Sequence, residues 1–221
     1  MLTYRAQDLV ETLVKQYGDD AYPGLADDLL QVDHLLEQQV HRSQITALAV
    51  GAVFSLTRND TYLIDLVMSA IGRVPEFRRR IGEPAVHLNR RIGVAARAAE
   101  PVASITAELL TNAVHHSHGT LPVSVAVHET DTGAAVVIED AGVGLNADQL
   151  EQAARLLGGE IPVRLVGLGD PPHTGWAAIG RIVRQYGIQV GLRTSRFGGV
   201  EATVHVPGRC WWRCPPAPSR R

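Results

Sequence analysis

The sequence has few of the features that mark specialised classes of protein. Its 221 residues hold two cysteines, Cys210 and Cys214, which are too few for a disulfide framework. It contains no run of 18 apolar residues, so no membrane span is predicted. The N-terminal stretch is charged throughout and lacks the apolar centre of a signal peptide. The net charge of −2 does not favour nucleic acid or anionic lipid as a partner. We therefore expect a soluble cytoplasmic protein.

The first part of the sequence predicts helices. A long helix is expected from about residue 25 to residue 56, because apolar residues follow steps of three and four, as at Leu29, Val32, Leu36 and Val40. Another is expected within 61–74, with Asp60 as its N-cap. Residues 85–94 indicate an extended segment or a hairpin.

The second part of the sequence predicts strands as well as helices. Apolar periodicity and β-branched content predict, in order, a helix at 101–117, strands at 122–130 and 133–140, helices at 147–158 and 175–187, and strands at 188–195 and 198–207. This pattern predicts a mixed sheet with helices on one face, an α+β sandwich. The final residues, 209–221, are expected to be disordered or loosely docked.

Two polar residues stand out within the helix at 101–117. Glu108 and Asn112 are four residues apart and therefore share one helix face, beside the apolar residues Leu109, Leu110 and Ala113. Polar side chains at the edge of a core need partners. The pair is either a solvent-facing stripe of an amphipathic helix or a site that holds a metal ion and a water.

Two glycine-containing stretches suggest ligand contacts. Asp140 directly follows a predicted strand, where its carboxylate can accept a hydrogen bond from an exocyclic amine, and Gly142 and Gly144 let the backbone approach a flat ring. Gly175 lies at the start of a helix, whose free N–H groups and dipole suit phosphate. Each stretch taken alone is also compatible with an ordinary turn.

In their order along the chain these stretches resemble the motifs of one family. ELLTNAVHHS resembles the N box of the Bergerat-fold (GHKL) ATPases, DAGVGL the G1 box, and HTGWAAIGRIVRQYG with GGVEATVHVP the G2 helix and terminal strands. The resemblance covers about residues 85–207 and is closest to actinobacterial sensor histidine kinases. It implies a Bergerat-type α/β sandwich that binds ATP with Mg²⁺.

The resemblance also implies roles for individual residues. Asn112 would ligate Mg²⁺, which accepts a carboxamide oxygen beside waters and phosphate oxygens. Glu108 would orient or deprotonate the attacking group, and Asp140 would read the adenine amine. The adenine pocket and phosphate site would be completed by Gly142, Gly144, His116, Thr174 and Gly175.

The sequence departs from the family at the G2 box. The usual pattern is G-x-G-L, whereas here Gly167 to Gly169 runs into Asp170-Pro171-Pro172, which cannot continue as a helix. The helix start reads Thr174-Gly175-Trp176, without a second glycine. Weak nucleotide binding or slow turnover is the expected consequence.

The N-terminal helices resemble the dimerisation segment of the same kinases. Asp33, His34 and Leu35 match its Asp-His-Leu, although no H-E-x-x-R phosphoacceptor box is present. His34 is thus a candidate catalytic phosphoacceptor, and the alternative is a polar histidine on a helix surface. We expect a helical segment at 1–80 that forms a homodimer, an ATPase domain at 81–207 and a flexible tail at 208–221.

The predicted function is a histidine protein kinase that lacks its own sensor and works with a partner regulatory protein or response regulator. Two alternatives belong to other classes. One is a serine kinase of the anti-sigma type, against which the long helical segment argues. The other is a non-catalytic scaffold that responds to nucleotide, which the altered G2 box favours.

Overall fold

The structure is a computed structural model and describes residues 9–10, 12–13, 25–49, 59–74, 80–117, 121–158 and 174–212. The chain divides into two compact units, Met1–Ile45 and Thr46–Arg221, so the division lies N-terminal to the boundary expected near residue 80. Helix α2 (Leu25–Ala49) begins where the sequence predicts. The predicted continuation of that helix to residue 56 lies outside the described residues.

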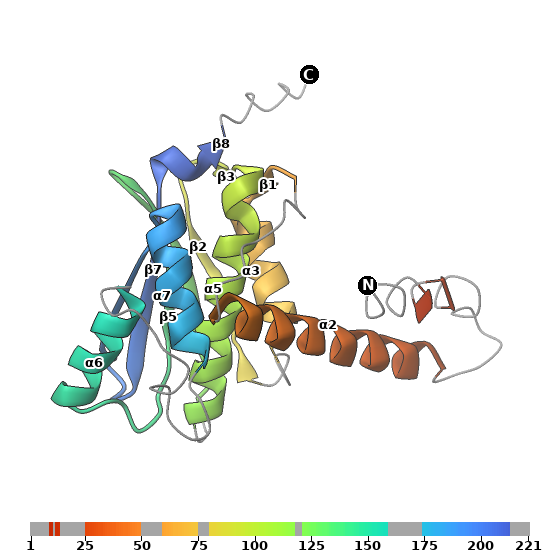
Figure 1. Cartoon of the computed structure of the whole chain (residues 1–221), viewed down its shortest axis with the longest axis horizontal. Coiled ribbons are helices and arrows are strands. Elements are labelled where there is room, and N and C mark those ends of the chain that lie inside the picture. Colours follow the sequence, from red (N-terminus) through yellow and green to blue (C-terminus); the bar gives the residue numbers. More distant parts are fainter. Residues whose placement is uncertain are drawn as a thin grey trace. The chain divides into compact units, whose positions relative to one another are not determined.

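A five-stranded sheet forms the centre of the larger unit (Figure 1). Its strands lie in the order β2 (Ala85–His87), β4 (Ser124–Thr130), β5 (Gly133–Glu139), β7 (Val200–Pro207) and β6 (Gln189–Thr194). Strands β2 and β4 are parallel, and the other neighbours are antiparallel. The sheet is therefore mixed, and strands form in all four segments predicted for the C-terminal half.

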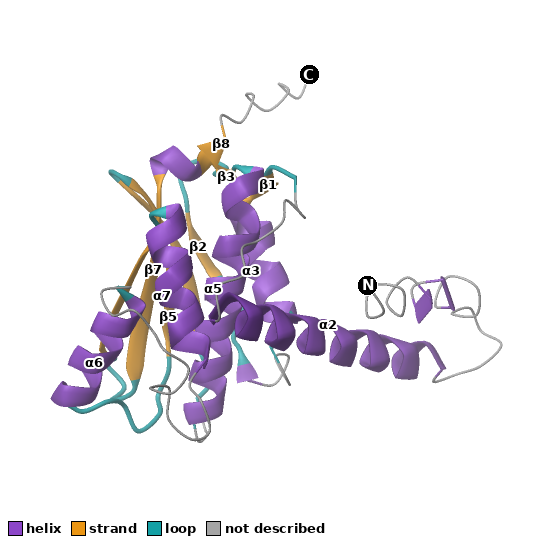
Figure 2. Cartoon of the chain, viewed as in Figure 1, coloured by secondary structure: helices purple, strands orange, loops and turns teal. Residues whose placement is uncertain are grey.

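Helices cover one face of this sheet (Figure 2). They are α5 (Ala96–His116), α6 (Ala147–Leu157) and α7 (Thr174–Tyr186). Alternate residues of the strands point into the core beneath them, because successive side chains of a strand face opposite sides. The inward positions Val127, Val136 and Val204 are completely buried. This arrangement confirms the predicted α+β class.

A small second sheet lies at one end of the unit (Figure 1). It contains β1 (Thr61–Tyr62), β3 (Gly93–Val94) and β8 (Trp211–Trp212), and β1 leads into α3 (Leu63–Gly72). The hairpin reading of 85–94 is wrong, because β2 and β3 belong to different sheets.

The start of the expected loose tail is also ordered. Residues Gly208–Cys210 form a 3₁₀ turn, and β8 pairs with β3. The carbonyl of Cys210 accepts a hydrogen bond from the Ala95 amide at 2.9 Å, and the Cys210 side chain is buried. The expectation of disorder is therefore wrong for 209–212, and residues 213–221 lie outside the described part.

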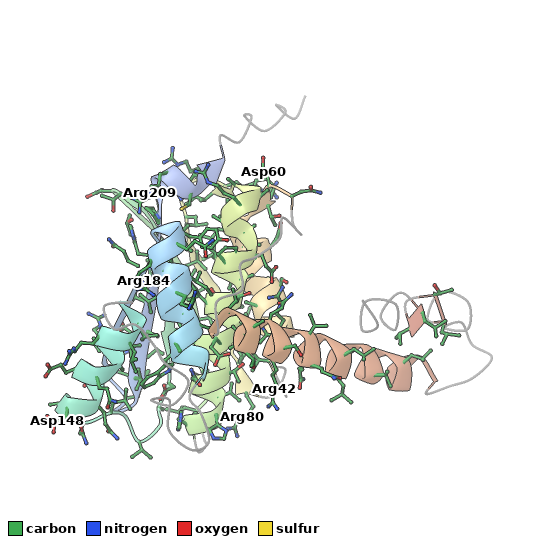
Figure 3. The ribbon with its side chains drawn as sticks, in the orientation of Figure 1. Arg42, Asp60, Arg80, Asp148, Arg184 and Arg209 are labelled. Carbon is green, nitrogen blue, oxygen red and sulfur yellow. The ribbon has the colours of Figure 1, made fainter. Side chains whose placement is uncertain are left out.

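Helix α5, which carries Glu108 and Asn112, is held at both ends. The Ala96 amide donates to Asp60 Oδ1 at 2.8 Å, and Arg80 Nη2 donates to the carbonyls of Val114 and Ser117 at 2.8 and 2.6 Å. Figure 3 shows Asp60 and Arg80 at opposite ends of this helix. These contacts satisfy helix-end groups that have no partner within the helix.

Asp60 therefore does not cap the helix for which the sequence suggested it. The N-cap of α3 is Tyr62, which makes no side-chain capping bond. Residues 61–62 pair with β3, so α3 begins at Leu63, and Asp60 lies too early in the chain to serve as its cap.

Candidate functional site

Glu108 and Asn112 lie on α5 beside the core. Both residues are half-buried, between the buried Ala107, Leu109 and Ala113. The Nδ2 atom of Asn112 is buried and has no hydrogen-bond partner among the described residues. A buried donor without a partner is costly in a folded protein, and a ligand oxygen would satisfy it.

The carboxylate of Glu108 lies against the start of α7. Gly175 is the second residue of that helix, and a Cβ at this position would lie 2.6 Å from Glu108 Cδ and closer still to Oε1. The absence of a side chain at Gly175 thus makes room for Glu108. The role for Gly175 that follows from the family resemblance, which is to face phosphate, remains a prediction. Thr174 is the first residue of α7, and its side chain lies outside the described atoms.

Asp140 follows the last residue of β5 and is almost fully buried. Its Oδ1 atom accepts hydrogen bonds from the amides of Gly142 at 2.8 Å and Val200 at 3.2 Å. Two backbone donors on the same oxygen fix the direction of the carboxylate. Both bonds use Oδ1, and among the described residues none donates to Oδ2, which could accept from a ligand.

The two glycines of the DAGVGL stretch each allow a close approach of the backbone. A Cβ on Gly142 would lie 2.5 Å from the carbonyl oxygen of His116, so this glycine lets the loop pack against the end of α5. Gly144 has a φ of +74°, and a Cβ there would lie 2.5 Å from the Gly198 carbonyl oxygen. The structure thus places His116 beside the loop through its backbone, while its ring is exposed and lies edge-on to His115.

The turn between β6 and β7 completes the surroundings of Asp140. The sequence predicts a hairpin turn here, around Phe197-Gly198-Gly199, and the structure confirms it, but the sequence does not single out the contacts of Ser195 and Arg196. The Ser195 hydroxyl donates to the Asp140 carbonyl at 2.9 Å. Arg196 contacts the buried Glu139 through two guanidinium nitrogens, at 3.2 and 3.0 Å. The glycines mark the turn in the sequence, but nothing local reports that its side chains reach the end of β5.

Two close contacts thus connect the predicted stretches: Gly175 at the start of α7 lies against Glu108 of α5, and Gly142 after β5 lies against the backbone of His116 at the end of α5. His34 lies in α2, and its side chain is outside the described atoms. Within the described ranges, no three His, Cys, Asp or Glu side chains gather as a metal site. A magnesium ion bound by one carboxamide and by phosphate oxygens needs no such cluster.

None of the helices in the described part is long and apolar enough to cross a membrane.

Comparison with known proteins identifies the fold and the family. The model of the histidine kinase-like ATPase domain matches residues 71–192, which is more than half of the chain. A search of curated proteins finds no match.

Three solved structures illustrate the shared fold. The mycobacterial sensor histidine kinase MprB matches with a TM-score of 0.52 and 18% identity, over 68% of this chain and 97% of that one. The Acinetobacter baumannii histidine kinase AdeS matches with a TM-score of 0.51 and 12% identity, over 93% of this chain and 94% of that one. Full-length ShkA in complex with AMPPNP matches with a TM-score of 0.57 and 17% identity, over 93% of this chain and 44% of that one.

Proposed function

Because the chain belongs to the family of histidine kinase-like ATPase domains, we propose that it binds Mg-ATP and transfers the γ-phosphoryl group to a histidine. The observation that carries the proposal is the buried carboxylate of Asp140, held through Oδ1 by two backbone amides. A fixed acceptor at the end of a strand suits the exocyclic amine of adenine. The solved ShkA structure with AMPPNP, an ATP analogue, supports the choice of ligand.

The residues of α5 suit the phosphate end of the nucleotide. The Nδ2 atom of Asn112 is a buried donor that a phosphate oxygen would satisfy, and its Oδ1 is the kind of ligand that Mg²⁺ prefers. When bound, Mg²⁺ would neutralise charge on the phosphates. Glu108, half-buried one turn before Asn112, would orient the attacking group and accept its proton.

His34 is the proposed phosphoacceptor. It lies in α2 within the N-terminal unit, for which we propose the homodimeric role of the kinase helical segment. A neutral imidazole is a competent nucleophile toward phosphorus. The phosphoryl group would then pass to a partner regulatory protein or response regulator.

Calorimetric titration of Mg-ATP into the wild type and Asp140→Asn tests nucleotide binding. The asparagine oxygen can still accept the amides of Gly142 and Val200, so this variant removes the charge while keeping the loop bonds. We expect binding in the wild type and a loss of at least about tenfold in affinity in the variant, the size of one charge-assisted hydrogen bond. A wild type that does not bind Mg-ATP would overturn the proposal.

Labelling with γ-phosphate tests the transfer step. Phosphohistidine is acid-labile and phosphoserine is not, so the stability of the label separates a histidine kinase from a serine kinase of the anti-sigma type. The label is expected to be acid-labile and to be absent in His34→Ala. ATP binding with no label on the protein or on a partner would instead identify a nucleotide-responsive scaffold.

A further inference from the structure

The turn between β6 and β7 is built around the hydroxyl of Ser195. Ser195 is 5% exposed, and its Oγ donates to the Asp140 carbonyl at 2.9 Å and accepts from the Phe197 amide at 3.0 Å. Its own amide donates to the Gly199 carbonyl at 2.9 Å. A single buried side chain thus closes the turn on itself and bonds it to the residue at the end of β5.

The closed turn also contacts the side chain of Asp140. Gly199 packs so closely that a Cβ there would collide with Asp140 Oδ1 and with its carbonyl oxygen. The next residue, Val200, supplies one of the two amides that hold Oδ1, at 3.2 Å. The direction of the Asp140 carboxylate therefore depends on where this turn lies.

Removing the Ser195 hydroxyl would leave the buried Asp140 carbonyl and the partly buried Phe197 amide with one bond fewer each. Backbone groups without partners draw in water or shift to find new ones. Either response moves the turn, and with it the Val200 amide, away from Asp140.

We propose that Ser195 is a positioning residue that sets the base selectivity of the site through Asp140. The proposal rests on the proposed binding of ATP. Adenine presents an amine at C6, which a carboxylate accepts, whereas guanine presents a carbonyl there, which a carboxylate repels. A correctly directed Asp140 therefore favours ATP over GTP, and a displaced one discriminates less.

The test is the ratio of the dissociation constants for Mg-GTP and Mg-ATP, measured by calorimetry in the wild type, Ser195→Ala and Ser104→Ala. Ser104 is the matched control, since it is another buried serine, and its hydroxyl donates to Glu100 Oε1 at 3.2 Å. We expect Ser195→Ala to weaken ATP binding about fivefold, the size of one net hydrogen bond, with little change for GTP. The ratio should then fall about fivefold in Ser195→Ala and stay unchanged in Ser104→Ala.

The ratio separates positioning from a merely structural role, because general loosening of the fold would weaken both nucleotides alike. An unchanged ratio in Ser195→Ala, with wild-type binding intact, overturns the inference and leaves the proposed function standing. No Mg-ATP binding by the wild type overturns both. If Ser195→Ala does not fold, Ser195→Cys replaces it, since a thiol fits the site but is a weak donor. Full selectivity in Ser195→Cys would contradict the inference.

Discussion

The carboxylate of Glu108 occupies the space beside the Cα of Gly175, so that the proposed catalytic base and the first turn of α7 fit together only because residue 175 has no side chain. This contact joins two stretches of the sequence that are far apart. It also means that the position of Glu108 can be changed without altering Glu108 itself.

Gly175→Ala should displace Glu108, because the new methyl group would overlap its carboxylate. We expect the free energy of unfolding to fall by about 1–3 kcal/mol, as for other overpacked sites. Phosphoryl transfer should slow more than ATP binding weakens, and denaturant unfolding with single-turnover kinetics would measure both effects.

The matched control is Gly72→Ala. Gly72 is the last residue of α3, and a Cβ there would meet nothing within 4 Å. Alanine is the better helix former, so this variant should be as stable as the wild type or up to about 1 kcal/mol more stable. Equal stability of the Gly175 and Gly72 variants would contradict the contact with Glu108.

Asp60→Ala should destabilise the start of α5. The variant removes the acceptor of the Ala96 amide, and loss of such a cap costs about 1 kcal/mol. Hydrogen exchange of the Ala96 amide should accelerate in Asp60→Ala and stay slow in Asp60→Asn, which keeps an oxygen in place. Unchanged exchange in Asp60→Ala would show that the cap contributes nothing.

Arg73→Met should be the most damaging single change to an ion pair. Arg73 makes two bonds to Glu100, at 2.9 and 3.2 Å, and both side chains are largely buried. Loss of the arginine removes a cation that makes two bonds to a buried carboxylate, at a cost of about 3 kcal/mol. Chemical denaturation would measure it.

Arg90→Met is the control for that experiment. Arg90 pairs with Glu129 at 2.9 Å, but its side chain is 67% exposed, and it also lies over the Trp211 ring. The expected cost is about 1 kcal/mol or less. Similar losses in the two variants would contradict the importance of burial, and the double variant Arg73→Met/Glu100→Met should recover most of the stability.

Cys210 should make stability fall in alkaline solution. Burial raises the pKa of its thiol above the ordinary value, and the cations Arg209 and Arg97 oppose that change only in part. The thiol pKa is higher in the folded protein than in the unfolded protein. The stabilisation that comes from the buried, protonated thiol is therefore complete below the unfolded pKa, about 8.5, and is lost as the pH rises through the folded pKa. Between pH 8 and pH 10 the unfolding free energy of Cys210→Ala should therefore fall less than that of the wild type. Parallel pH profiles would contradict this assignment.

The long elements could be predicted because their signals lie within their own residues. Strand β5 is a continuous β-branched and small apolar run, and α5 carries an apolar helical period. The two-residue strands carry no such signal. Gly93 becomes a strand residue by pairing with Trp212, which is more than a hundred positions away, and no local pattern reports that partner.

The same distinction applies to the site. Glu108 and Asn112 are related by a helical turn, and Asp140 directly follows its strand, so local sequence places all three on the elements where the structure has them, while their roles stay predictions. Ser195 and Arg196 reach Asp140 and Glu139 because β5 and β7 are neighbours in the sheet. That pairing is a property of the fold, so sequence reasoning did not find these two residues.

Strand β5 is hydrogen-bonded to a neighbour on each side over its whole length, to β4 and to β7. Its amides are therefore the ones that only global unfolding exposes to solvent, whereas the edge strands β2 and β6 open at lower free energy. Asp140 follows the last residue of that strand. The backbone of the residue proposed to read the base is thus attached to a strand that opens late, whereas the turn that directs its carboxylate continues the edge strand β6 and opens earlier.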